Sequence, residues 1–151
     1  MALTGQLIGQ VEINSHADLV HDLLRYKPHD IPSICPHSVY RFDLISGEIG
    51  AVGSIICWTY PHEGKTKVTK ELIEEVDETN HKIVFKLIEG DLLDVYKAFT
   101  ITFHVEPKEG KQLVTWTFDF EKQNPSVPDP ITVMDLLCSI IKDMDAHTHS
   151  K

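Results

Sequence analysis

Three polar side chains, Tyr60, Glu71 and His37, are the candidates for chemistry in this chain. A phenol, a carboxyl group and an imidazole can each pass a proton to or from a bound molecule that lies within hydrogen-bond reach. Glu71 and Lys97 both fall in strand patterns whose parity can point them inward, where a lone charge is costly unless it is paired or used. A position facing solvent is the default expectation for both.

The nine histidines raise the question of a metal site or an acid–base centre. His29 and His37 lie around a short helical segment and can face the mouth of a pocket. Five others fall at element ends, in turns or at the end of the chain, where solvent is the default surrounding: His16, His62, His81, His147 and His149. No Ser-His-Asp, Cys-His or paired-carboxylate spacing stands out. We therefore expect no metal site and no cofactor.

Two glycine-containing segments resemble phosphate-binding loops but have the wrong spacing. Glycines at 47, 50 and 53 do not match the dinucleotide fingerprint, and a strand pattern follows them where that fingerprint requires a helix. Gly64-Lys65-Thr66 copies the end of a P-loop, but Thr59 stands where the first glycine should be. Tight turns and close approach of backbones explain both segments.

Composition limits the possible partners. The chain has 151 residues, 42% of them hydrophobic, and no long biased run, which predicts one globular domain over residues 1–151. A net charge of −9 without a basic patch argues against nucleic acid. The chain contains no window of eighteen apolar residues, so we expect no membrane span. Its first residues alternate between apolar and polar, unlike the apolar core of a signal peptide. Three widely spaced cysteines fit reduced thiols in the cytoplasm.

One long helix is predicted, over residues 129–146. Asp129 can cap its first amide groups and Pro130 suits the first helical position. The polar residues form one narrow strip: Thr132, Asp135, Ser139, Lys142 and Asp143. Because most of the remaining circumference is apolar, this helix must be wrapped by other elements.

Alternating patterns predict seven strands, at 3–13, 38–45, 54–60, 66–76, 81–89, 95–105 and 112–121. Ser15 can cap a short helix over 16–26, and a second short helix or turn lies in 29–36. Short links between consecutive strands favour antiparallel neighbours. The sequence thus predicts an α+β fold in which a seven-stranded antiparallel sheet accompanies one C-terminal helix. The sequence does not specify whether the chain pairs with another subunit.

The proportions of these elements indicate a cavity. Seven strands make a sheet about 30 Å wide, whereas a helix is about 10 to 12 Å across, so one helix cannot cover the sheet flat. If the sheet curls around the helix, one parity of each strand faces the hollow, although strand 66–76 is ambiguous because Val68 and Leu72 favour one parity and Ile73 the other. These side chains can also fill the space completely. The residues expected to line the cavity are Ile56, Trp58, Tyr60, Ile83, Phe85, Phe99, Ile101, Phe103, Trp116, Met134, Leu137 and Ile141.

The whole chain resembles the major latex protein branch of the birch-pollen-allergen, pathogenesis-related family. The resemblance rests on the order of elements and on four segments: SGEIGAVGSIICWTYPHEGK at 46–65, LIEGDLLDVYKAF at 87–99, VTWTFDFEKQNPSVPDP at 114–130, and IIKDMDAH near the end. It implies a START-like helix-grip fold with an apolar cavity, in a cytosolic plant protein associated with defence. The implied ligands are small hydrophobic molecules such as terpenoids, alkaloids, sterols or phenolics. Some relatives act as cofactor-free isomerases or cyclases of specialised metabolism.

Three hypotheses follow. The first is a carrier that holds an apolar ligand among the inward residues, with entry between residues 29–37 and the strand turns. The second is an isomerase or cyclase that uses the same cavity, with Tyr60, Glu71 or His37 moving a proton. The third is a filled core with a role in surface interactions.

Overall fold

The computed structural model describes residues 3–149, so the outer ends of the expected domain, residues 1–2 and 150–151, lie outside the described part. The elements in chain order are β1 (Thr4–Ile13), α1 (Ala17–Arg25), η1 (Pro28–Asp30), α2 (Ile31–Ile34), β2 (Arg41–Ser46), β3 (Ile55–His62), β4 (Lys65–Asp77), β5 (Lys82–Gly90), η2 (Asp91–Asp94), β6 (Tyr96–Lys108), β7 (Lys111–Lys122) and α3 (Ile131–His149). No helix within 3–149 is both long and apolar enough to cross a membrane.

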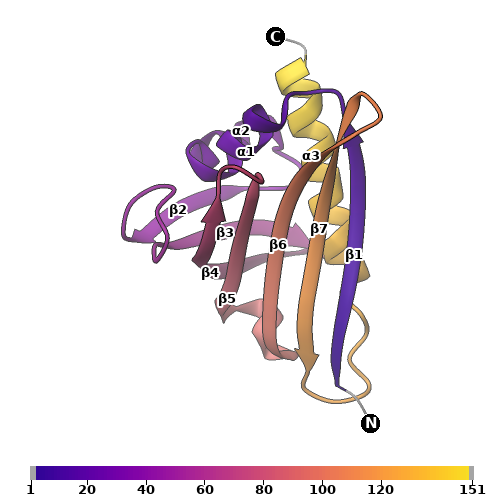
Figure 1. Cartoon of the computed structure of the whole chain (residues 1–151). Coiled ribbons are helices and arrows are strands. Elements are labelled where there is room, and N and C mark those ends of the chain that lie inside the picture. The colour runs from indigo at the N-terminus through magenta and orange to yellow at the C-terminus, as the bar shows by residue number, and fades with distance from the viewer. Residues whose placement is uncertain (1–2, 150–151) are drawn as a thin grey trace.

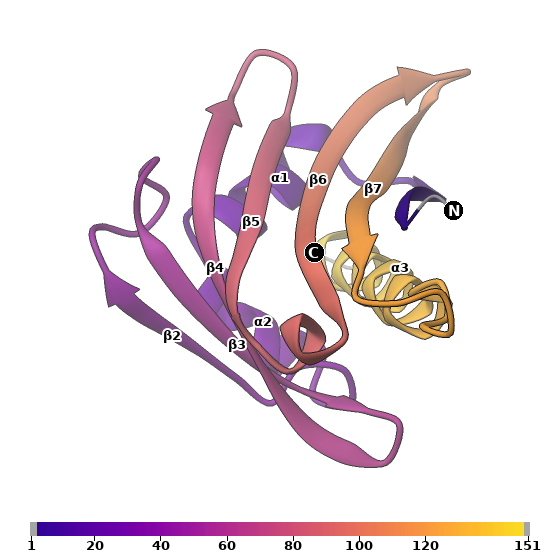
Figure 2. The ribbon, with the colours of Figure 1, turned by 90° about the horizontal axis from the view of Figure 1, so that it is seen from below.

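The seven strands form one antiparallel sheet in the order β1-β7-β6-β5-β4-β3-β2. The sheet curls, and α3 lies on its concave side toward the end formed by β7 and β1 (Figures 1 and 2). The short helices α1 and α2 close one end of the concave side (Figure 1). The predicted fold is confirmed: a curved antiparallel sheet holds a long C-terminal helix, and short helices lie between strands 1 and 2.

The ambiguous parity of β4 has two sources. Val68 and Leu72 are apolar but lie on the outward face, where Val68 is exposed and Leu72 half-buried. The strand also changes its parity further along. Thr69, Glu71 and Ile73 are buried and alternate regularly, but the pairing with β5 shifts between Ile73 and Glu75. This β-bulge gives β4 one extra residue, so Val76 joins the inward face three positions after Ile73. A two-residue period cannot describe a strand that contains such a bulge.

The helix α3 begins and ends at other residues than the predicted helix over 129–146. The helix begins at Ile131, and Pro130 provides the first accepting carbonyl, to the amide of Met134 at 3.1 Å. The Asp129 carbonyl oxygen accepts a hydrogen bond from the amide of Ile131 at 2.8 Å, and its carboxylate pairs with Lys122 at 2.7 Å. The helix also continues to residue 149, so the histidines at 147 and 149 belong to its last turn, where a tail was expected.

Ser15 joins β1 to α3 and does not cap α1. His16 occupies the N-cap position of α1 and makes no side-chain capping bond. Asp145 of α3 instead accepts hydrogen bonds from the amides of Asn14 and Ser15 at 3.1 and 2.9 Å and from the Ser15 hydroxyl at 2.6 Å. Thr148 adds a further contact to the same hydroxyl. These bonds tie the last turns of α3 to the end of β1.

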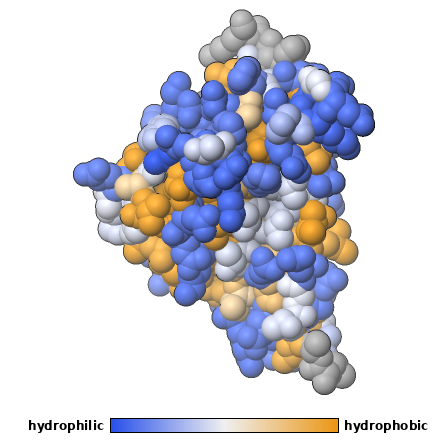
Figure 3. Space-filling view, in the orientation of Figure 1, coloured by the Kyte–Doolittle hydropathy of each residue, from blue (hydrophilic) through white to orange (hydrophobic). Residues whose placement is uncertain are grey.

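The face shown in Figure 3 intersperses hydrophilic and hydrophobic residues. The large buried side chains lie on the inward parity of β5, β6 and β7, where Phe99, Phe103 and Phe118 are almost completely covered. The core therefore lies between the concave face and α3.

We predict that Asp145→Ala lowers the free energy of unfolding by about 1 to 3 kcal/mol, because two amides and one hydroxyl lose their acceptor in a half-buried position. Urea denaturation followed by circular dichroism measures this loss. Asp143→Ala is the matched control, since that residue is exposed on the same helix. Equal stabilities of the two variants would contradict the proposed role of Asp145.

Candidate functional site

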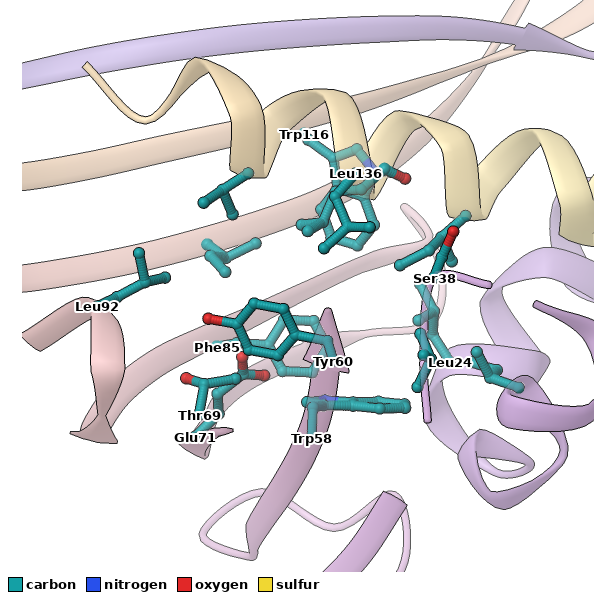
Figure 4. A pocket seen from close by; sticks show the side chains of 16 residues that line it. Leu24, Ser38, Trp58, Tyr60, Thr69, Glu71, Phe85, Leu92, Trp116 and Leu136 are labelled. Carbon is teal, nitrogen blue, oxygen red and sulfur yellow. The ribbon is translucent and has the colours of Figure 1, made fainter. Parts of the chain in front are cut away.

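An apolar cavity opens between α3 and the strands that α3 does not cover (Figure 4). The centre of a water molecule can occupy about 80 Å³ of it, and the empty space between the side chains, counted out to the solvent opening, is about 710 Å³. The lining residues are Leu24, Ile31, Ser38, Val39, Trp58, Tyr60, Thr69, Glu71, Phe85, Leu92, Ile101, Trp116, Val133, Leu136, Leu137 and Ile140.

Half of the twelve residues predicted to line a cavity do so, and the rest lie deeper in the core. Those at the cavity are Trp58, Tyr60, Phe85, Ile101, Trp116 and Leu137. Those that are buried but do not line it are Ile56, Ile83, Phe99, Phe103, Met134 and Ile141. Parity correctly selects the concave face but says nothing of position along the strand. Phe99 packs its ring against Phe118 and Phe120, where the core is filled.

The helix α3 presents two apolar stripes, and only one faces the cavity. Met134 and Cys138 lie against Gly9 of β1, where an added Cβ would come within 2.5 Å of the Met134 sulfur. The cavity stripe is offset around the helix and contains Val133, Leu136, Leu137 and Ile140, at i, i+3, i+4 and i+7. Both stripes are apolar in the sequence, so periodicity could not identify the one beside the hollow.

The sequence reasoning also missed lining residues outside α3. Leu24 belongs to a recognised apolar stripe of α1, but nothing in the sequence shows that this stripe reaches the cavity. Ile31, Ser38 and Val39 come from the irregular segment around α2. Leu92 belongs to η2, in the link between the predicted strands 81–89 and 95–105. Local pattern carries no signal for such tertiary placements.

The structure brings two of the three candidates for proton transfer to the cavity. Tyr60 and Glu71 line it, whereas His37 is exposed and does not. The expectation that Glu71 faces solvent is wrong, because its side chain follows the inward parity set by Thr69 and Ile73 and is only 5% exposed. Lys97 does face solvent, as expected.

Three polar side chains gather on one wall and form what we call the polar end of the cavity: Tyr60 of β3 with Thr69 and Glu71 of β4 (Figure 4). The strand register places them on one face of neighbouring strands, since Thr69 pairs with Trp58 and Glu71 with Ile56. The hydroxyls of Tyr60 and Thr69 are buried and have no hydrogen-bond partner within residues 3–149. Buried hydroxyls are normally satisfied, so these two are available to a bound molecule.

Burial controls the protonation of this polar end. Desolvation raises the pKa of Glu71 from 4.5 to about 8, and a hydrogen bond from the Trp58 indole offsets part of that rise. Burial likewise raises the pKa of the Tyr60 phenol, with the carboxyl groups of Asp91 and Glu71 adding to the effect. At neutral pH the cavity without a ligand therefore holds a carboxylic acid that can donate or accept a hydrogen bond.

The two tryptophans that line the cavity make contacts that fix their rings. The Trp116 indole donates a hydrogen bond to the Leu137 carbonyl of α3 at 3.2 Å. Trp58 packs against Phe42 with ring centroids 4.8 Å apart. The cavity therefore has rigid aromatic walls.

No histidine among the described residues lines the cavity. His29 is exposed and lies 3.7 Å from Asp30, away from the lining. Two histidines expected in solvent are held by hydrogen bonds: His62 contacts Thr132 of α3 at 2.6 Å, and His81 contacts Asp18 of α1 at 2.6 Å. Among the described residues, no three His, Cys, Asp or Glu side chains are placed to hold a metal ion.

Comparison with known families decides the relationship. The sequence model that defines the "Pathogenesis-related protein Bet v 1 family" matches residues 2–151 of this chain. The chain belongs to this family. Its relatives include MLP-like protein 34 of Arabidopsis thaliana, 40% identical over 146 residues, which are 95% of this chain and 46% of that protein. Major latex protein 149 of Papaver somniferum is 35% identical over 96% of this chain and 91% of its own length. The predicted resemblance to major latex proteins is confirmed.

Coverage differs between these Bet v 1 family relatives. This chain spans about half the length of MLP-like proteins 34 and 28, but 94% of MLP-like protein 43, all three from Arabidopsis thaliana. MLP-like protein 43 is 36% identical over 148 residues.

Solved structures show the same fold. Ginseng major latex-like protein 151 from Panax ginseng superposes with a TM-score of 0.94 at 40% identity, over 97% of this chain and 99% of that one. Norcoclaurine synthase from Thalictrum flavum, solved with dopamine and hydroxybenzaldehyde, superposes at 0.80 over 97% of this chain and 87% of that one. Its identity is 18%, so this second likeness concerns the fold alone.

The raised pKa of Glu71 predicts how stability changes with pH. The folded protein holds the proton of Glu71 up to about pH 8, whereas the unfolded chain releases it near 4.5. The stability that this proton confers is therefore full below about pH 4.5 and is lost as the pH rises to about 8.

We predict that Glu71→Gln gains stability relative to the wild type over this interval, by up to about 1.4 kcal/mol per pH unit. Urea midpoints between pH 5 and pH 8 measure the gain. Glu74→Gln removes the same charge at an exposed position of β4 and is the control. If the urea midpoints of Glu71→Gln and the wild type changed in parallel with pH, the burial of an unpaired carboxyl group would be refuted.

Proposed function

We propose that the protein binds a small hydrophobic plant metabolite in the cavity beside α3 and acts as its carrier. The observation that carries this proposal is an interior space with an almost wholly apolar lining that opens to solvent. Terpenoids, alkaloids, sterols and phenolics are the ligand classes we consider. The cytosol suits this role because all three cysteines are free thiols.

The driving force for binding would come from apolar area removed from water. At about 25 cal/mol per Å², covering 200 Å² of ligand surface contributes about 5 kcal/mol before the entropy cost of association. The rings of Trp58, Phe85 and Trp116 provide broad contact surfaces. Such contacts recognise size and shape more than functional groups, so the apolar part of the cavity accepts several skeletons.

We predict that Leu136→Trp weakens the binding of an apolar fluorescent dye at least about tenfold, which corresponds to about 1.4 kcal/mol. Leu136 is a half-buried cavity residue of α3, so a larger side chain there takes the space that the dye needs. Dye titration measures the change, with the thermal midpoint as a check on folding. Leu19→Trp, at an exposed position of α1, is the control. Unchanged dye affinity in a folded Leu136→Trp variant would contradict binding in this cavity.

A second candidate function is a cofactor-free isomerase or cyclase that acts on a terpenoid or alkaloid intermediate. The observation that favours it is Glu71, a buried carboxyl group with a pKa near neutrality inside the cavity. Such a group can act as a general acid or a general base near physiological pH. Tyr60 can assist by orienting the substrate through its free hydroxyl.

If the protein is such an enzyme, it changes the product ratio of a reactive intermediate, and Glu71→Gln slows that reaction by roughly 10² to 10⁴. Tyr60→Phe is expected to have a smaller effect, since it removes an orienting hydroxyl and leaves the acid in place. Product analysis by chromatography, with and without protein, measures both. Product ratios that the wild-type protein leaves unchanged would exclude the enzyme and leave the carrier proposal standing.

A further inference from the structure

We propose that the polar end of the cavity is a subsite for an ammonium group, so that the preferred ligand is a hydrophobic amine in its protonated form. This inference rests on the proposed binding function and specifies the chemistry of the ligand. Its basis is the arrangement of charge and hydrogen-bonding groups around Glu71.

The cavity lining carries an acidic group but no basic one. Glu71 is the only acidic residue among the sixteen lining residues, and none of them is lysine, arginine or histidine. Glu71 is only 5% exposed and has no cationic partner among residues 3–149. An ionised carboxylate without a partner is costly in an apolar surrounding, and a ligand cation beside it removes much of that cost. A ligand carboxylate would place a second negative charge next to the first.

The neighbouring groups can complete the coordination of an ammonium ion. An ammonium group donates up to three hydrogen bonds, and the oxygens of Glu71, Tyr60 and Thr69 can each accept one. The hydroxyls of Tyr60 and Thr69 are buried and have no protein partner within residues 3–149. The aromatic rings of Trp58 and Tyr60 add faces that attract a cation.

The charged groups around the polar end support the same ligand. Asp91, which precedes the cavity residue Leu92, acts electrostatically on Tyr60. Cys57 of β3 is near enough to feel the charge of Glu71 but is an uncharged thiol, because burial raises its pKa. From α3 only the apolar residues Val133, Leu136, Leu137 and Ile140 face the cavity.

Three basic residues of the β3–β4 hairpin, Lys67, His62 and Lys70, lie outside the cavity lining and have other partners. Lys70 pairs with Glu89 at 2.7 Å. Lys67 contacts the His62 ring at 3.0 Å and the Glu63 carboxylate at 3.5 Å. His62 also contacts Thr132 at 2.6 Å. None of the three belongs to the cavity lining, so none competes with a ligand for Glu71.

Three probes with one skeleton test the inference: 4-phenylbutylamine, 4-phenylbutan-1-ol and 4-phenylbutanoic acid. Binding is measured by quenching of the two tryptophans, both of which line the cavity, and by calorimetry in buffers of different ionisation enthalpy. At pH 7 the amine is expected to bind at least tenfold more tightly than the alcohol, and the acid more weakly than either.

Proton release gives a readout that simple packing would not produce. Because Glu71 holds its proton up to about pH 8, binding of an ammonium ion at pH 7 expels nearly one proton. The affinity for the amine therefore rises almost tenfold from pH 6 to pH 7 and less steeply from pH 7 to pH 8. The alcohol releases none. In Glu71→Gln both the preference for the amine and the proton release should disappear, while Glu74→Gln retains both.

The outcomes separate this inference from the function beneath it. Equal or tighter binding of the alcohol, or an amine preference that survives in Glu71→Gln, overturns the ammonium subsite and leaves a hydrophobic binding protein. Failure of the wild type to bind the alcohol, the amine or an apolar dye refutes the binding function itself, and the subsite with it.

Discussion

The structure depends on how a single helix is seated on a sheet much wider than itself. Gly9 leaves room for this seat, because an added Cβ there would come within 2.5 Å of the Met134 sulfur of α3 and that side chain would have to move. The helix can therefore approach β1 closely, near one edge of the sheet. Asp145 fixes the C-terminal end of α3 to Ser15, and the pairing of Asp129 with Lys122 fixes its approach. Because the helix is held at one side, it does not cover the concave face of β3, β4 and β5. The short helices α1, α2 and η2 close the ends of this face, and the cavity lies between them and α3.

The cavity contains a group that a purely structural core would exclude. Glu71 is buried without a cation, and the Tyr60 and Thr69 hydroxyls are buried without partners within residues 3–149. Each of these features costs stability, since buried polar groups are normally paired. Two irregularities in the pairing of β4 with β5 flank this region, one next to Glu71 and one after Ile73. Irregularities of this kind commonly re-aim side chains beside functional sites. A buried carboxyl group that lowers stability, placed beside irregular strand pairing, is expected where function takes precedence over stability.

Much of the fold follows from local pattern, and the errors have physical causes. The strands are recognisable because alternation and turn residues agree, as at Gly64 and Gly110, which both adopt positive φ in the turns. The inward face of β3, β5, β6 and β7 follows from parity. The side of β4 does not, because the apolar residues Val68 and Leu72 lie on its outward face, and a bulge at Glu74 then breaks the two-residue period. Ser15 has the right position for a helix cap, yet the acceptor it meets is 130 residues away on α3. The cavity lining from α2 and η2 is equally tertiary in origin and leaves no mark in the local sequence.

The two stripes of α3 separate stability from recognition. Met134 and Cys138 face β1, so changes there disturb the seat of the helix. Val133, Leu136 and Ile140 face the hollow, where a change of size or polarity alters the cavity and leaves the seat intact. The same separation holds on the sheet, where Phe99 and Phe118 fill the core while Trp58, Tyr60 and Glu71 line the cavity. A fold built in this way can exchange one set of side chains without losing the other. Selectivity in this protein is therefore expected to reside in a few cavity residues, and above all in the single carboxyl group among them.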